Sequence, residues 1–160
     1  MPASVSAASG GRDLSGLVDA LDRSLAVIEF EPTGVIISAN RNFLDTMGYR
    51  LDEIKGHQHR MFCDELFYRE HPDFWQELAQ GTFKSGRFQR FDKKGHEVWL
   101  EATYNPVLDE GSGKVTRIIK FAVDVTAQVE EEIRTAALVK DWTDDEIWAL
   151  QRGGDRKSTR

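Results

Sequence analysis

The apolar residues of the chain recur with two periods, one helical and one alternating, and the switches between these periods predict its elements. Leucine and valine side chains repeat at helical spacing and predict a helix over residues 13–24. An Ala/Ser/Gly-rich segment, residues 1–12, precedes this helix and is expected to be disordered. Two short apolar runs follow, separated by the turn-forming sequence Glu31-Pro32-Thr33-Gly34. This part of the chain therefore predicts a helix and then two strands joined by a turn.

The middle of the chain predicts short helices. Phe43, Leu44 and Met47 share one helical face, and Gly48 is placed to end that helix. The sequence after Gly48 has no clean period until a second helix over residues 72–80, where Pro72 would occupy the first helical position.

Three longer strands are predicted next, over residues 86–92, 96–107 and 114–125. Apolar and polar residues alternate in the second and third of them, as in strands with one buried face. One face of the second strand carries Val98, Leu100, Ala102 and Tyr104, and an apolar stripe of the third carries Val115, Ile119, Phe121 and Val123.

A helical period returns at Thr126 and predicts a helix over residues 126–140. The last part of the chain, residues 141–160, predicts a short helix and a tail. Thr143 and Glu146 have the spacing of a capping box at the start of this helix, and Gly153-Gly154 is expected to end it.

Composition narrows the functional classes. The chain of 160 residues is 40% hydrophobic, which suits one compact domain with tails, and its net charge of −6 disfavours general binding to nucleic acid. Cys63 is the only cysteine, so no internal disulfide forms and a zinc site would lack thiolate partners. No apolar run approaches the ~20 residues of a membrane span, and the N-terminus lacks the pattern of a secretory signal. We therefore expect a cytoplasmic protein.

The basic residues of the two central strands have a simple interpretation. Arg87, Arg90, Lys93 and Lys94 form a basic group among aromatic residues, but glutamates interleave with them, which favours a solvated sheet edge and turn over a nucleic-acid surface. No nucleophile lies in a pattern with a base, and the Gly111-Ser112-Gly113 turn lacks the lysine and helix of a phosphate loop. The chain is not expected to be an enzyme.

Three segments carry a resemblance to a known family. The sequences "ANRNFLDTMGYRLDEIKG", "KKGHEVWLEATYNPVLDEGSGKV" and "FAVDVT" resemble, in this order, characteristic segments of the PAS sensor domain. The resemblance implies an α+β fold in which a five-stranded antiparallel sheet carries short helices on one face. It also implies a PAS core over residues 25–125, an N-terminal cap helix and a C-terminal signalling helix.

Within the PAS family the chain is most similar to domains of chemotaxis and aerotaxis transducers, on the sequence "HRMFCDELF…FWQELAQGTFKSGRFQRFDKKGHEVWLEATYNPV". Some of these relatives hold FAD, so the resemblance implies a flavin-binding redox or oxygen sensor. The cofactor-binding residues that it implies are Asn40, His59, Trp75, Leu100, Ala102 and Tyr104. One loop departs from the pattern, because Cys63-Asp64-Glu65-Leu66 stands where aerotaxis transducers have Arg-His-Pro-Asp, so the flavin contacts of that loop are not reproduced.

Light–oxygen–voltage domains, which are also PAS domains, provide a contrast. His59 occupies the position of their photoactive cysteine, and Leu100 the position of a flavin-contacting asparagine. The resemblance therefore does not imply a thiol photoadduct.

Two alternatives to a flavin sensor remain open. A haem b sensor would need an axial histidine, for which His57, His59 and His71 are candidates. A cofactor-free dimerisation or interaction module would fill its interior with side chains. A homodimer through the cap helix or the sheet face near Trp99 is expected, with a monomer whose cap helix folds back on its own sheet as the alternative. The signal is expected to leave through Asp124 and Thr126 to a downstream partner.

Overall fold

The computed structural model describes residues 7–140 and 142–155, and the chain divides after Val125 into two compact units. The elements of the first unit are α1 (Ala7–Ser24), β1 (Ala26–Phe30), β2 (Ile36–Ala39), α2 (Arg41–Met47), α3 (Leu51–Ile54), the 3-10 helix η1 (His59–Phe62), α4 (Glu65–Glu70), α5 (Phe74–Ala79), β3 (Lys84–Phe91), β4 (Glu97–Leu108) and β5 (Val115–Asp124). The second unit contains α6 (Thr126–Lys140) and α7 (Asp144–Asp155).

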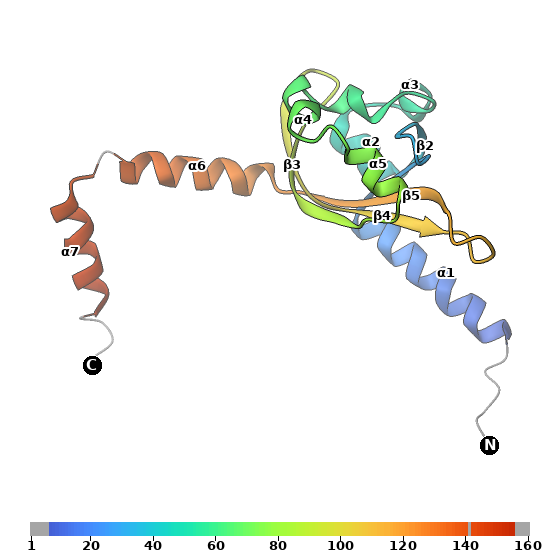
Figure 1. The fold of residues 1–160 in the computed structure, drawn as a ribbon. Helices are drawn as coiled ribbons and strands as arrows, with labels where there is room; N and C mark the ends of the chain where they lie inside the picture. The colour runs from blue at the N-terminus through green and yellow to red at the C-terminus, as the bar shows by residue number, and fades with distance from the viewer. Residues whose placement is uncertain (1–6, 141, 156–160) are drawn as a thin grey trace. The chain divides into compact units, whose positions relative to one another are not determined.

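The five strands form one antiparallel sheet in the order β2-β1-β5-β4-β3. The short helices α2 to α5 gather on one face of this sheet, and α1 approaches the other (Figure 1). The predicted α+β architecture, with a five-stranded antiparallel sheet and short helices on one face, is confirmed.

The face of the sheet beneath the short helices forms the core. Its residues in β4 are the predicted set, Val98, Leu100, Ala102 and Tyr104, all buried. In β5 the buried residues are instead Ile118, Lys120 and Ala122, whereas Val123, from the apolar stripe singled out in the sequence, is 48% exposed. The apolar stripe of β5 therefore lies on the outer face of the sheet. The inner face of this strand has Lys120 at its centre, which interrupts the apolar pattern there.

Three element ends differ from the prediction. Helix α1 begins at Ala7, so part of the segment expected to be disordered is helical. Helix α5 begins at Phe74 with Asp73 as its N-cap, so Pro72 precedes the helix and does not open it. Helix α7 continues through Gly153-Gly154 to Asp155. The predicted capping box is present, because Thr143 and Glu146 bond each other's backbone amides.

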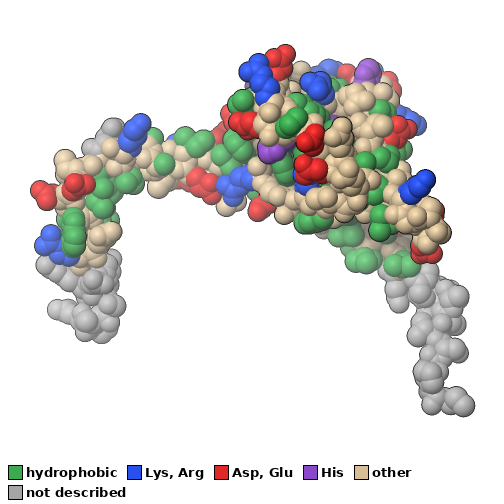
Figure 2. All heavy atoms as spheres, in the orientation of Figure 1, with side chains coloured by type: hydrophobic (Ala, Val, Ile, Leu, Met, Phe, Trp, Pro, Cys, Tyr) green, Lys and Arg blue, Asp and Glu red, His purple; other side chains and the backbone are tan. Residues whose placement is uncertain are grey.

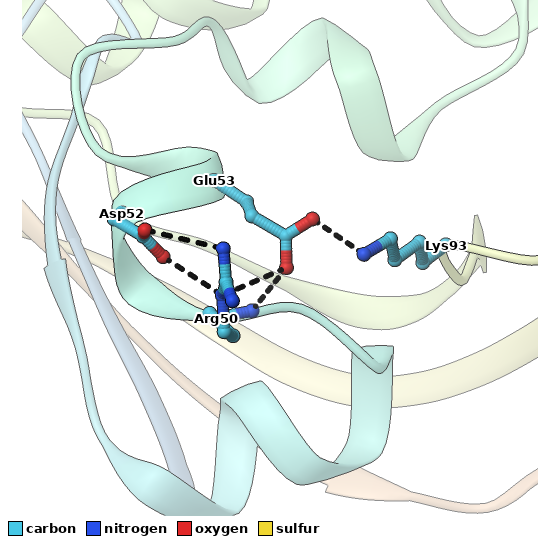
Figure 3. Close-up of polar contacts among 4 residues, drawn as sticks. All are labelled: Arg50, Asp52, Glu53 and Lys93. Atoms are coloured by element: carbon cyan, nitrogen blue, oxygen red, sulfur yellow. Dashed lines mark hydrogen bonds and ion pairs between the residues drawn. The ribbon is translucent and has the colours of Figure 1, made fainter.

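An exposed ion-pair network joins α3 to the turn between β3 and β4 (Figure 3). The Glu53 carboxylate accepts from the Arg50 amide at 2.9 Å and from Lys93 Nζ, and the bond from Lys93 is the main reason that its pKa lies below the usual value. The side chain of Lys93 is half exposed, as predicted for the turn. The space-filling view likewise shows charged side chains distributed over the surface of this unit (Figure 2).

The turn between β1 and β2 requires glycine for two reasons. Gly34 has a φ of 91°, in the left-handed region, and a Cβ at this position would lie 2.8 Å from Cε2 of Trp75. The carbonyl of Gly34 also accepts from the His59 amide at 3.0 Å. The turn therefore positions both the first residue of η1 and the indole of α5.

Replacing Gly34 with alanine should destabilise the protein more than the same change at Gly95, which has a φ of 83° and open space around it. Both variants bear the left-handed strain of about 1–2 kcal/mol. Gly34→Ala should lose about 1–3 kcal/mol more, because its methyl group displaces Trp75. Urea denaturation of both variants measures the difference, and equal losses would contradict the close packing of Trp75 on the turn.

Candidate functional site

Aromatic rings fill the interior between the inner face of the sheet and the short helices. Each ring lies within contact distance of its neighbours, with centroid separations such as 4.9 Å between Phe74 and Tyr104 and 5.3 Å between Phe88 and Tyr104. The set comprises Phe30, His59, Phe67, Tyr68, Phe74, Trp75, Phe88 and Tyr104. Most of these pairs meet edge to face, the arrangement that aromatic rings prefer.

His59 lies at the centre of this interior and is fully buried. Its Nδ1 lies 2.7 Å from the Tyr68 hydroxyl and its Nε2 lies 3.0 Å from the Tyr104 hydroxyl. The ring of Phe74 stacks on the imidazole at 5.9 Å and an interplanar angle of 15°. Burial, and secondarily the charges of Arg90 and Lys120, hold the pKa of His59 well below its usual value, so the ring is neutral near pH 7.

The hydrogen bonds of His59 extend to a helix on one side and to an edge strand on the other. Trp75 Nε1, in α5, donates to the Tyr68 hydroxyl at 3.1 Å. Arg90 Nη2, in β3, donates to the Tyr104 hydroxyl at 3.1 Å. The result is a continuous chain Trp75–Tyr68–His59–Tyr104–Arg90, called the His59 chain below, which links the helices to the sheet.

Two cations are buried in the same interior. Arg90 and Lys120 are 1% and 2% exposed, and among the described residues neither forms an ion pair with a carboxylate. The guanidinium of Arg90 lies over the ring of Phe67 at 4.2 Å, and Lys120 Nζ lies 4.8 Å from the ring centroid of Tyr104. Arg90 Nε is buried without a hydrogen-bond partner. Unpaired buried cations are costly, so this pair is a candidate for function.

The sequence interpretation of Arg90 as part of a solvated basic edge is wrong, and Lys120 was missed. The signal that could have found both is sheet register, because residues directly opposite each other point to the same face. Arg90 pairs with the buried Val98, and Lys120 pairs with the buried Tyr104 and Ile28. The side chain of each cation therefore faces the interior, as do the side chains opposite it on the neighbouring strands.

The predicted cofactor residues lie in two places. His59, Trp75, Leu100 and Tyr104 meet in the interior, with Ala102 buried beside them on β4. Asn40 instead caps α2: its Oδ1 accepts from the amides of Phe43 and Val27, and its Nδ2 donates to the Leu25 carbonyl at 2.8 Å. The Asn40 amide is thus engaged in holding the first strand and α1 to α2.

The three histidines considered as haem ligands also differ in position. His57 and His71 are exposed, and only His59 faces the interior, where both of its ring nitrogens contact tyrosine hydroxyls. Cys63 lies beside it, with Sγ 3.6 Å from Nδ1, and burial raises the pKa of its thiol.

The residues expected to transmit a signal lie on the sheet and at the boundary between the units. The indole nitrogen of Trp99 donates to the Glu97 carboxylate at 2.8 Å. The backbone carbonyl of Trp99 accepts from the Val125 amide, also at 2.8 Å. Asp124 is exposed at the end of β5, and Thr126 is the first residue of α6. Trp99 and Tyr104 both belong to β4, so this strand connects the interior to the boundary.

Four grooves border the described part of this unit, and three of them matter for the site. Two of about 570 and 550 Å³ lie on the outer face of the sheet, and Leu21 of α1 borders both. The third, of about 390 Å³, lies between α4 and β3 and is lined by Phe67, Phe88 and Arg90. It therefore reaches one of the buried cations from the surface.

The neutral His59 predicts a pH dependence of folding. The folded pKa lies below the unfolded value of 6.5, so the unfolded state binds more protons in acid, and the free energy of unfolding falls as pH drops below 6.5. The loss should approach about 1.4 kcal/mol per pH unit. His59→Asn should remove this contribution, and His57→Asn, at an exposed position, should retain it. Denaturation between pH 7 and pH 4.5 tests the difference, and parallel profiles for all three proteins would contradict a neutral buried ring.

Comparisons with known proteins agree with this architecture. The family model described as "PAS fold" matches residues 36–122, more than half of the chain. Biofilm dispersion protein BdlA of Pseudomonas aeruginosa is 47% identical over 115 residues, which are 71% of this chain and 27% of that protein. The bacterioopsin transcriptional activator of Halobacterium salinarum is 25% identical over 138 residues, 79% of this chain and 20% of that protein. The chain thus spans about a quarter or less of the length of these relatives.

Solved structures show the same fold. An RNA-binding light–oxygen–voltage receptor superposes with a TM-score of 0.66 at 24% identity, over 88% of this chain and 40% of that one. The PAS domain of a protein from Colwellia psychrerythraea superposes with a TM-score of 0.59 at 22% identity, over 71% and 98% of the two chains. No helix in the described part of the chain is long and apolar enough to cross a membrane. With its matched sequence, its sheet order and its short helices on one face, the chain belongs to the PAS family.

Proposed function

We propose that this PAS domain is the sensing part of a longer signal-transduction protein, and that its interior binds FAD as a redox or oxygen sensor. The observation that carries the proposal is the aromatic interior with its excess of donors: Arg90, Lys120 and the His59 chain. A planar ring system with several acceptor atoms suits such a site. The sequence resemblance to flavin-holding transducers supports FAD in particular.

The residues of the chain have distinct parts in this proposal. FAD, when bound, supplies reversible electron transfer. Trp75 packs on one side of the site, Leu100 and Ala102 form its floor, and Arg90 and Lys120 supply positive charge to its acceptor edge. A change of charge at that edge alters the hydrogen bonds of Tyr104, on the same strand as Trp99. Because the Trp99 carbonyl holds the Val125 amide, the change is communicated to Asp124 and Thr126, and so to α6 and a downstream partner.

Two other functions have supporting observations. A haem b sensor is supported by His59, the buried candidate ligand, although ligation would replace its bond to Tyr68 or to Tyr104. A cofactor-free interaction module is supported by the mutual packing of the interior rings. In all three cases we propose a cytoplasmic, non-enzymatic signalling role of the kind found in chemotaxis, without a nucleic-acid partner.

The absorption spectrum of the purified protein and the mass of any released cofactor separate these functions. Flavin bands are expected, whereas a Soret band would support haem, and a colourless protein that does not bind added FAD would support the cofactor-free module. Trp75→Ala should weaken FAD binding about tenfold through lost ring contacts. Trp99→Ala, on the outer face, is the matched control. Equal FAD affinity in both variants would remove Trp75 from the site.

We also propose a homodimer through α1 and the outer face of the sheet. Leu14, Leu17 and Val18 of α1 are more than half exposed, and Phe121 lines both of the grooves that α1 borders. An apolar surface of this kind is typical of an interface between subunits.

Val18→Asp should convert the dimer to a monomer, because it buries a charge in the interface. Ser15→Asp, on the polar side of α1, should leave the dimer intact. Sedimentation velocity of the wild-type protein and both variants tests this, and an unchanged mass for Val18→Asp would rule out α1 as the contact.

A further inference from the structure

The side chains of the His59 chain offer one more hydrogen-bond donor than the four hydrogen bonds among them use. Apart from the remaining N–H groups of Arg90, five polar hydrogens are available to it: one from Arg90 Nη2, one from Trp75 Nε1, one from the neutral imidazole and two from the tyrosine hydroxyls. Four contacts join them. If Nδ1 carries the imidazole hydrogen, the Tyr68 hydrogen is unused, and if Nε2 carries it, the Tyr104 hydrogen is unused. For either tautomer of His59, one tyrosine hydroxyl therefore has no acceptor within the His59 chain.

The two buried cations add to this excess. Arg90 Nε is buried with no hydrogen-bond partner, and Lys120 Nζ lies 4.8 Å from the centroid of the Tyr104 ring. Both cations adjoin the same residue, since Arg90 donates to the Tyr104 hydroxyl and Lys120 lies against its ring. Buried donors without acceptors are rare in folded proteins. The two buried cations are thus gathered around one side chain, Tyr104.

We propose that the interior contains an anion site, in which Arg90, Lys120 and the unused tyrosine hydroxyl bind a negatively charged, acceptor-rich group of the ligand. The inference rests on the proposed function only in taking the interior as a ligand site. It adds the chemical class of the ligand, namely a carboxylate or an equivalent anionic edge held among aromatic rings. The groove between α4 and β3, which Arg90 lines together with Phe67 and Phe88, is the route to this site.

Two sources supply this chemistry. One is the pyrimidine edge of a flavin, which carries adjacent acceptor atoms and becomes negatively charged on reduction. The other is a small organic carboxylate. Both present acceptors to Arg90 and Lys120 and a planar group to the surrounding rings, so the two are distinguished by experiment.

The surroundings of Lys120 make the binding of an anion depend on pH. Burial, and secondarily the charge of Arg90, lower the pKa of Lys120 well below its usual value of 10.5. The ionisable groups that act on or contact it are Arg90 of β3, Tyr104 of β4, and His59 and Cys63 beside η1. None of these is a carboxylate. An anion next to Lys120 raises its pKa, so binding at a pH where the amine is neutral takes up a proton from solvent.

The test uses the full chain without cofactor, titrated calorimetrically with sodium benzoate, sodium acetate and FAD at constant ionic strength. Benzamide, a neutral ligand of the same shape as benzoate, is the ligand control. Lys120→Met and Arg90→Gln remove the two cations, and Lys94→Met and Arg41→Gln make the same changes at exposed positions. Runs in buffers of different ionisation enthalpy measure the proton uptake.

We expect at least one anionic probe to bind, benzamide to bind far more weakly than benzoate, and each cation variant to lose about tenfold in affinity. The exposed controls should match the wild type, and Lys120→Met should abolish the proton uptake. Lys120→Met removes a buried amine and keeps a similar shape, so it tests the site even if Arg90→Gln does not fold.

The possible results separate this inference from the flavin function. Binding of benzoate or acetate that depends on both cations, without binding of FAD, would support the anion site and overturn the flavin proposal. FAD affinity unchanged in Lys120→Met would overturn the anion site and leave the flavin proposal standing. Failure of all three anionic probes to bind the wild type would overturn the anion site.

Discussion

The contact of His59 with two tyrosine hydroxyls is the interaction on which the interior depends. His59 is the first residue of η1, and the hydrogen bonds of its imidazole to Tyr68 of α4 and Tyr104 of β4 hold the helical layer to the sheet. Because the ring is fully buried, its neutral form is favoured, and it acts as donor on one side and acceptor on the other. Trp75 and Arg90 join the ends of the same chain, so the positions of α5 and β3 also depend on it.

The same interior is expensive to form without a ligand. Arg90 and Lys120 are removed from water, and in the described part of the chain neither meets a carboxylate. Contacts with aromatic faces offset part of this cost, as between Arg90 and Phe67. A site that is costly when empty gains most from an acceptor that fills it. In the proposed anion site, stability and ligand binding are therefore linked through these two residues.

The strand β4 connects this interior to the rest of the molecule. Tyr104 lies on its inner face with the cations, and the Trp99 carbonyl holds the amide of Val125, where the first unit ends. The outer face bears Phe121 and Val123 and is bordered by α1, so the interior and this apolar outer surface share one sheet.

The sequence by itself determined most of the strands and longer helices and the resemblance to the family. The alternation in β4 identified its inner face, and Gly48 and the Thr143–Glu146 pair identified helix ends, because caps, turns and periods are local properties. Only the tertiary structure decided which face of β5 is buried and that Arg90 and Lys120 point inward. A charged residue in a strand looks solvent-facing until cross-strand register places it between Tyr104 and Ile28. The burial of a charge is set by neighbours distant in sequence, and no local pattern encodes them.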